Sequence, residues 1–486
     1  MKDEIGNGKA RVPSSTLWGK VRMGELSVFC FLLFWLLLAG CAGPRTMLME
    51  RVRTDLSASD YQKAYTAYQK SVGQTTDVEQ LLNLGLLAFE AGDYATAQKT
   101  FEDADRLAEE RQTKSLSREA AGIAVSDRVR AYQGTDFDKA MLHYYRALGY
   151  IAAGNFADAA VEGRRIAAYL EVLSRDGKHT YRDDAYLQWF NGSLYQGFGQ
   201  INDAWISYKR SRELYKNYYG VPSPSFLCPL GMQAAQQSGL SETVEELRKE
   251  CPDTAAIRHR DYGRVVMICE TGLAPPIQET NLVFPIFTND QTSWADDAAR
   301  ERYAYDVYRR GNDYEYDRTK LKYLLRVAMP VYPQYYQGSR VNGIVVRDAQ
   351  DREYHAELME NVGAVLEQDL KDRYGAIAVR AIIRALIKYA AKEGAEKIGG
   401  KNNETLGSIL GAVVNAAGVI SEAADTRSWE TLPDRIYVAD FELPPGLHTL
   451  RALFEDGTGG TLKRHDFPPV DVKQGQTVFL RVRCTQ

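Results

Sequence analysis

Cysteines and acidic side chains are the residues of this chain that could take part in covalent or acid–base chemistry. The sequence has six cysteines and six histidines among 486 residues, with 64 acidic and 60 basic side chains. It contains no HExxH, CxxC, GxSxG or phosphate-loop pattern. The paired acids Asp183-Asp184 and Asp296-Asp297 lie in charged segments, where solvated helix starts favour acidic residues. We therefore expect no catalytic residues, no metal and no cofactor, and a hydrolase is the less favoured alternative.

Cys41 is the cysteine whose surroundings point to a definite reaction. The apolar run Val28–Leu38 fits the core of a signal peptide, whereas a membrane-spanning helix needs about 20 residues. The residues Leu38-Ala39-Gly40-Cys41 resemble the lipobox of bacterial lipoproteins, in which the cysteine thiol takes the lipid and the chain is cut before it. With Ala42 next, the resemblance implies that residues 1–40 are removed and that Cys41 anchors a periplasm-facing protein in the bacterial outer membrane. The alternative is an ordinary signal peptide in which Cys41 is incidental.

Four cysteines would remain in the oxidising periplasm: Cys228, Cys251, Cys269 and Cys484. Four cysteines allow three pairings. Because Cys228 and Cys251 flank one short helical segment, we expect a disulfide between them, which leaves Cys269 to pair with Cys484. Four buried thiols are the alternative.

The N-terminal half contains internal repeats of a helical hairpin. Residues 81–108 have the residue spacing of a tetratricopeptide repeat (TPR): Gly85 lets two helices approach closely, Gly92 ends the first helix and Phe101 fills the space beneath. Residues 185–215 repeat this pattern, with Gly192 and Tyr208 at the equivalent positions. Weaker copies cover 142–167 and 231–250, and a leading helix covers 60–72. Since each repeat buries its apolar face on a neighbour, we predict one TPR-like solenoid over residues 41–255.

TPR arrays bind proteins in a concave groove that the first helix of each repeat lines. The register of the repeats predicts a partner-binding groove formed by Glu79, Leu82, Phe89, Glu90, Met141, Tyr144, Tyr186, Trp189 and Gln196. Aromatic residues crowd positions 186–219. They could form the helical core, a protein-binding groove or a platform that stacks on sugar rings.

The C-terminal half, residues 256–486, changes to short β-rich segments separated by glycine and proline turns. Strands are expected at 264–270, 281–287, 320–331, 340–348, 435–442, 448–454, 461–467 and 477–483, which together predict a β-sandwich. A charged helix is expected at 293–311, and a helical insert covers about 356–424. Within it, the glycine-containing run 406–420 is either a buried helix or a membrane or oligomer contact. The predicted fold class is α+β: an all-α TPR-like solenoid, then a β-sandwich-like domain.

Two further segments are distinctive. In Tyr132–Lys139, Gly134-Thr135-Asp136 predicts a turn and a helix N-cap, with Asp136 or Thr135 accepting from the first free amides. In Asp425–Pro433, Trp429 is expected to anchor the junction. With the lipobox and the repeat at 142–167, they resemble an uncharacterised family of TPR-containing bacterial envelope lipoproteins. That family combines a Y-x-G-T-D-F segment with a Thr-Arg-Ser-Trp…Leu-Pro junction. The resemblance implies location and architecture but no activity.

The net charge and the predicted architecture limit the functions that can be expected. The net charge of −4 gives no basic footprint for nucleic acid. We expect a membrane-anchored periplasmic lipoprotein that serves as a TPR protein-binding scaffold, or as an accessory factor for an envelope or cell-wall assembly. Its partners would be the membrane, through the lipid, and a protein of the envelope. A glycan- or peptidoglycan-binding module is the alternative.

Overall fold

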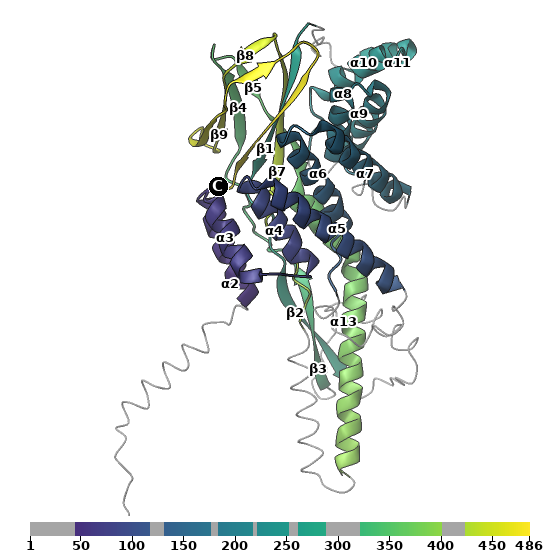
Figure 1. Ribbon diagram of the computed structural model, residues 1–486. Helices are drawn as coiled ribbons and strands as arrows, with labels where there is room; N and C mark the ends of the chain where they lie inside the picture. Colours follow the sequence, from purple (N-terminus) through teal and green to yellow (C-terminus); the bar gives the residue numbers. More distant parts are fainter. Residues whose placement is uncertain are drawn as a thin grey trace, which may run out of the picture. The chain divides into compact units, whose positions relative to one another are not determined.

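The computed structural model describes residues 44–116, 131–175, 183–216, 221–251, 261–287, 321–400 and 423–486. The lipobox at 38–41, the expected helix at 293–311 and the run 406–420 lie outside the described residues. Contacts divide the chain into Met1–Glu50 and a larger compact unit, Arg51–Gln486. That unit contains helical hairpins followed by sheets (Figure 1), so the predicted fold class is confirmed. The change from helices to strands falls between Glu250 and Gly263.

The helical part is a series of antiparallel hairpins. After α2 (Pro44–Ser57) and α3 (Tyr61–Val72) come the pairs α4 (Val78–Glu90) with α5 (Tyr94–Leu116), α6 (Asp136–Ala152) with α7 (Phe156–Arg175), α8 (Ala185–Gly197) with α9 (Ile201–Tyr215), and α10 (Leu227–Gln237) with α11 (Ser241–Glu250). Each hairpin also packs on the next one. In each pair, the turn between the two helices contains a glycine with positive φ: Gly92, Gly154, Gly199 or Gly239. This is a TPR-like stack.

Two helical glycines explain how closely the paired helices approach. A Cβ atom on Gly85 would lie 2.6 Å from the ring of Phe101, and one on Gly192 would lie 2.6 Å from the ring of Tyr208. Both rings are fully buried. The repeat pattern predicted that each of these glycines allows close helix approach and that the aromatic ring fills the space beneath it. The structure shows this packing in both hairpins.

Gly192→Ala should destabilise the protein by about 1–2 kcal/mol, because overpacking outweighs the roughly 1 kcal/mol that alanine gains in a helix. The Tyr208 ring cannot retreat easily, since its hydroxyl accepts from Arg264 and donates to Gln196. Gly231→Ala is the matched control: its added Cβ would meet Trp205 at an ordinary 3.6 Å, so stability should rise. Thermal unfolding followed by circular dichroism measures both, and a more stable Gly192→Ala variant would contradict the packing account.

The C-terminal half holds two four-stranded sheets packed face to face. The first has the order β12 (Thr477–Cys484), β1 (Gly263–Thr271), β7 (Arg435–Leu443), β6 (Glu357–Asn361). The second has the order β10 (Thr461–Asp466), β9 (Leu450–Glu455), β4 (Gly343–Asp348), β5 (Glu353–His355), and β8 (Gly446–His448) pairs with β11 (Val470–Val472). Within the first sheet, β1 runs parallel to β12 and antiparallel to β7. One apolar core with residues from both sheets, such as Met267 and Phe454, makes this a β-sandwich.

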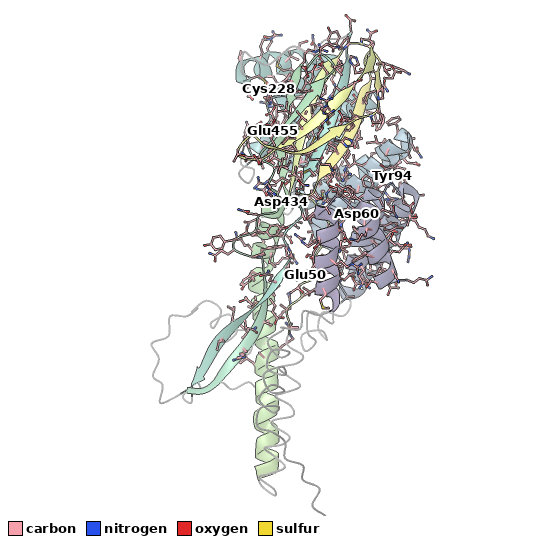
Figure 2. The ribbon with its side chains drawn as sticks, turned by 90° about the vertical axis from the view of Figure 1, so that its left-hand side faces the viewer. Glu50, Asp60, Tyr94, Cys228, Asp434 and Glu455 are labelled. Carbon is pink, nitrogen blue, oxygen red and sulfur yellow. A yellow bond between two sulfur atoms is a disulfide. The ribbon has the colours of Figure 1, made fainter. Side chains whose placement is uncertain are left out.

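A β-ribbon and a long helix extend from the sandwich. The strands β2 (Gln278–Phe287) and β3 (Leu321–Val331) pair with each other, and β3 lies beside α13 (Val362–Gly400) before the far end of the ribbon diverges from it (Figures 1 and 2). Met329, Ile382 and Leu386 belong to one apolar cluster. The helix begins at 362 rather than about 356, because Glu357–Asn361 forms an edge strand and the Asn361 side chain accepts from the amide of Ala364. In the described part of the chain, we find no helix long and apolar enough to cross a membrane.

Asp434 lies where the sandwich meets the start of α13 (Figure 2). Its carbonyl accepts from the amide of Gly363 at 3.3 Å, and its carboxyl group fills the space beside Gly338 and Gly363, where a Cβ would clash with it. Burial raises the pKa of Asp434 to about 6, against the opposing charges of Arg435 and Arg53. Because Gly338 and Gly363 have no side chains, the carboxyl group of Asp434 can pack against both of them at this junction.

The cysteines follow the prediction only in part. Cys228 and Cys251 form a disulfide across the last hairpin, with Cα atoms 6.0 Å apart. Cys269 and Cys484 are buried free thiols, so the second predicted disulfide is wrong. Both face the sandwich core from neighbouring strands, but the register pairs Cys269 with Val482, which sets the two cysteines two residues apart along the ladder. A two-residue offset places the two Cα atoms farther apart than a disulfide can span.

Candidate functional site

The predicted groove residues all lie on the first helices of the repeats and are packed inside the protein. Seven of them have almost no exposure: Glu79, Leu82, Phe89, Met141, Tyr144, Tyr186 and Trp189. Glu90 is partly buried as a residue, but its side chain is only 4% exposed. Gln196 is partly buried and accepts from Arg264 of β1. The groove is therefore occupied by the chain's own C-terminal half, and in this conformation a separate partner cannot reach these residues.

Strand alternation explains why the first sheet fits against the helices. On β1, the residues Val265, Met267 and Cys269 face the sandwich core, so Arg264 and Glu270 face the opposite side. On β12, Arg481 and Arg483 alternate with the core residues Val482 and Cys484 in the same way. The helices cover this charged face, and all nine residues of β1 are buried.

Four charged side chains form one cluster between the helices and the first sheet. Arg481 pairs with Glu90 and with Glu270, each at 2.5 Å, and Arg483 pairs with Glu90 at 2.8 Å. The guanidinium of Arg481 also lies over the Phe89 ring, 4.8 Å from its centroid. Burial alone would raise the pKa of Glu90, but the two arginines lower it to about 2. Glu90 is therefore an ionised carboxylate that binds the sheet to the first repeat.

Tyrosine hydroxyls complete the shell around Glu270. Tyr144 and Tyr145 each donate to its carboxylate at 3.1 Å, and Tyr186 donates to the hydroxyl of Tyr144 at 2.9 Å. Burial raises the pKa of all three phenols well above its ordinary value, so they remain hydrogen-bond donors at neutral pH. The middle repeats thus contribute neutral donors to a buried carboxylate on β1.

Arg264 forms a second contact, against the third repeat. Its guanidinium binds Asp440 of β7 at 2.5 Å and donates to Ser193, Gln196 and Tyr208 at 2.8–2.9 Å. The charge of Asp440 favours the protonated guanidinium although burial opposes it. A fully partnered arginine of this kind fixes one orientation of helix against strand.

The junction segment 423–433 provides the third contact, at the first repeat. The Asn83 side chain donates to Glu79 and to the carbonyl of Ser428, and accepts from the amide of Thr431 at 3.1 Å. Trp429 is 2% exposed and packs against both Phe101 and Tyr145, with ring centroids 5.8 Å apart in both cases, while those two rings also stack on each other. As predicted, the tryptophan anchors this junction, and its partners are the repeat helices.

The aromatic residues of the third repeat are core residues. The rings of Tyr186, Trp189, Phe190 and Tyr208 are fully buried. Tyr218 and Tyr219 lie outside the described residues. Among the other described rings, Tyr195, Trp205 and Tyr215 are buried and Phe198 is partly exposed, so the core alternative accounts for most of them. The charges that hold the sheet, Arg264, Glu270, Arg481 and Arg483, were missed in the sequence. The available signal was their spacing: 264 and 270, and likewise 481 and 483, are an even number of residues apart, so within each strand they fall on the same face.

The two distinctive segments, Tyr132–Lys139 and Asp425–Pro433, lie almost 300 residues apart in sequence, and residues of both line one cavity. The cavity has a volume of about 350 Å³, and β3 and α13 form its other walls. Thr135 caps α6: its hydroxyl accepts from the Asp138 amide at 3.0 Å, while the Asp138 carboxylate accepts from the Thr135 amide at 2.8 Å. Gly134 has φ +75°, as the turn requires. The predicted turn and N-cap are therefore one wall of a cavity.

His143 is a buried histidine in the second repeat that could be suspected of acid–base chemistry. Its Nδ1 lies 2.8 Å from Glu162, and its Nε2 lies 4.0 Å from Asp105. Both ring nitrogens face carboxylates, which suits a structural ion pair. The described residues include no group of three or more histidine, cysteine or acidic side chains that could hold a metal ion.

Comparisons with known proteins find matches among solved structures. No protein-family model matches the sequence, and neither does any curated protein. Among solved structures, MamA matches with 15% identity over 40% of this chain and 90% of its own, at a TM-score of 0.27. BtubC from P. vanneervenii matches with 16% identity over 42% and 76%, at 0.30. PilW, a type IV pilus biogenesis factor, matches with 14% identity over 43% and 93%, at 0.23.

Proposed function

We propose that this chain is a lipid-anchored scaffold that holds a protein partner at the periplasmic face of the bacterial outer membrane, as an accessory factor of an envelope assembly. The observation that best supports a binding role is that the first helices of the repeats already bind a protein surface, the first sheet of the chain's own sandwich. The lipobox-like segment ending at Cys41 supports the anchor.

Because the first sheet of the sandwich occupies the groove, the partner would bind at a different place from the one that the sequence predicts. The groove contacts include the buried pairs of Glu90 with Arg481 and Arg483, and separating buried partners of this kind costs several kcal/mol. We infer that the repeat array fixes the sandwich and α13 in place and that the partner binds a surface outside the groove. Acylation would confine that surface near the membrane and raise its effective concentration for a membrane-bound partner.

The anchor is tested with Cys41→Ser in the full chain, expressed in a Gram-negative host. The unchanged protein should stay in the membrane pellet after a high-salt wash and leave it only with detergent, because acyl chains rather than charges hold it. Cys41→Ser should move to the soluble periplasmic fraction. Cys30→Ser, within the segment expected to be removed, is the matched control and should stay in the pellet. Retention of Cys41→Ser in the washed pellet would refute the anchor.

The scaffold role is tested by affinity capture of the lipidated protein after chemical cross-linking in intact envelopes, read by mass spectrometry. We expect one or a few envelope proteins enriched over the Cys41→Ser capture, with cross-links on the outer surface of the repeats or on exposed sandwich loops. Cross-links from groove residues such as Tyr186 to a foreign protein would contradict the closed groove, and no enrichment at equal expression would contradict the scaffold.

A further inference from the structure

The strand β12 is an outer strand of the first sheet, and one side of its backbone is open. The carbonyls of Gln476 and Cys484 accept from backbone amides on the β1 side, so the even-numbered residues of β12 form the parallel ladder. The N–H and C=O groups of Thr477, Phe479 and Arg481 therefore point away from β1. In the described part of the chain, no group forms a hydrogen bond with them.

The open stretch of this edge is short. At Arg483, the next odd-numbered position, the backbone carbonyl accepts from the Tyr61 hydroxyl at 3.1 Å and from the Lys463 ammonium at 2.6 Å. Residues 477–481 are all partly exposed, whereas residues 482–485 are buried. Residues 477–481 are therefore the part of β12 that another strand can reach, and we call them the open edge.

The other outer strands of the two four-stranded sheets are protected. On β6, the Met359 carbonyl accepts from the Tyr215 hydroxyl at 2.8 Å. The strand β10 has a shifted register after Thr461 and carries Lys463 and Arg464, and β5 is only three residues long. Charges, register shifts and short length all hinder the addition of a strand. By contrast, β12 pairs with β1 in unbroken register and begins with the uncharged run Thr-Val-Phe-Leu.

Apolar side chains flank the open edge on both faces of the sheet. On the sandwich face, Val478 and Leu480 pack against the core and are partly buried. On the helix face, the Phe479 ring lies 6.4 Å from the Phe190 ring, between centroids, and a Cβ on Gly197 would lie 3.8 Å from it. Because Val478, Phe479 and Leu480 are only partly covered, a strand added at this edge would bury more of their surface.

The contact between the repeats and the first sheet ends near the start of β12 in further aromatic rings. Phe198 follows Gly197 directly and is partly exposed. Its ring lies 6.1 Å from that of Phe156, which is 43% exposed. The established interface between helices and sheet therefore continues as an apolar surface that water still reaches.

We propose that the open edge of β12 binds an extended segment of the partner protein, which pairs with β12 as a further strand of the first sheet. This inference rests on the proposed scaffold function and names its docking surface. The segment is short, free of proline and apolar on both faces, because its side chains lie beside Phe479 on one face and beside Val478 and Leu480 on the other.

A second copy of the chain fits the open edge less well. Only three residues present outward backbone groups, and the carbonyl of Arg483 is already bound. The contact between two such edges is small beside the roughly 1,200–2,000 Å² that a stable protein interface buries. A short stretch of this kind suits a peptide segment.

The test is photocross-linking of the lipidated full chain in its native envelope. The photoreactive residue p-benzoylphenylalanine replaces Gln476, which is exposed and directly precedes β12. The control carries it in place of Tyr335, which is 91% exposed. We expect position 476, and not position 335, to form an adduct with one envelope protein. Mass spectrometry should place the cross-link in an apolar segment without proline.

Three substitutions of Thr477 test whether strand pairing forms the adduct. Thr477→Pro removes an outward N–H that β1 does not use, so the chain should still fold, and the adduct yield should fall about fivefold or more. Thr477→Lys keeps the N–H but places a charge at the edge; it should also lower the yield, and it covers the case in which Thr477→Pro fails to fold. Thr477→Val is the matched control and should leave the yield unchanged.

The outcomes separate the docking edge from the scaffold role. An adduct that Thr477→Pro and Thr477→Lys leave unchanged, or an adduct with a second copy of the chain, would overturn the docking edge. So would the lack of an adduct at position 476 while affinity capture still enriches an envelope protein, and the scaffold role would then stand. If that capture also enriches nothing, the scaffold role fails and the docking edge fails with it.

Discussion

Arg481→Met should destabilise the protein by about 3–5 kcal/mol, among the largest effects that we expect from a single substitution. The change leaves Glu270, which is fully buried, with only the hydroxyls of Tyr144 and Tyr145 as hydrogen-bond partners, and it leaves Glu90 with Arg483 alone. The loss should be visible as a lower midpoint in urea denaturation followed by far-ultraviolet circular dichroism.

A double-mutant cycle separates the ion pair from simple loss of packing. Glu270→Gln removes the charge that Arg481→Met would strand, so the double variant should be more stable than the sum of the single changes predicts, by about 1–3 kcal/mol. Arg347→Met, which breaks a half-exposed pair with Glu353, should cost less than about 1 kcal/mol. Additive losses in the cycle would show that the charges do not cooperate across the interface.

The same measurement tests whether helices and sandwich unfold together. Because Glu90 on α4 is bound by two arginines of β12, the repeat array and the sandwich share one buried interface. We expect Arg481→Met to shift the helix signal and the tryptophan fluorescence by the same amount. Two separate transitions in the unchanged protein would mean that the halves are independently stable.

Trp429→Ala should cost about 3–5 kcal/mol, as expected for removing a large buried aromatic side chain. The ring packs against both Phe101 and Tyr145, and its indole N–H donates to Thr431 at 3.0 Å. Its loss therefore detaches the junction segment from the first two repeats. Differential scanning calorimetry should show a lower unfolding temperature.

Two controls define what that result means. Trp429→Phe keeps most of the ring contact and should cost clearly less than Trp429→Ala. Tyr335→Ala removes an aromatic side chain that is 91% exposed and should leave the unfolding temperature almost unchanged. A Trp429→Ala protein as stable as Tyr335→Ala would contradict the role of the tryptophan as an anchor.

Local features of the sequence were sufficient to predict the helical hairpins. Gly92 turns the first hairpin, and Gly85 with Phe101 sets its helix spacing, all within one stretch of about 20 residues. The N-cap at Thr135 is local in the same way. Turn chemistry, helix periodicity and glycine–aromatic packing within a hairpin depend on neighbours in the sequence, so they can be predicted without knowledge of the rest of the fold.

The edge strand β6 and the free thiols required the tertiary structure. Glu357–Asn361 is a strand because β7, about 80 residues later, offers it a partner, and no local pattern records that pairing. Cys269 and Cys484 share a core, but only the register between β1 and β12 shows that they are offset by two residues.

The sequence by itself determined that a TPR-like array precedes a sandwich. It predicted a partner-binding groove on the first helices of the repeats, and only the tertiary structure decided what packs against those helices. The occupant is a sheet whose strands β1, β7 and β12 come from distant parts of the chain, and the charges of Arg264, Glu270 and Arg481 have partners only once those strands and the helices meet. Charge pairing across such separations depends on the whole fold, whereas the hairpins depend on their own residues.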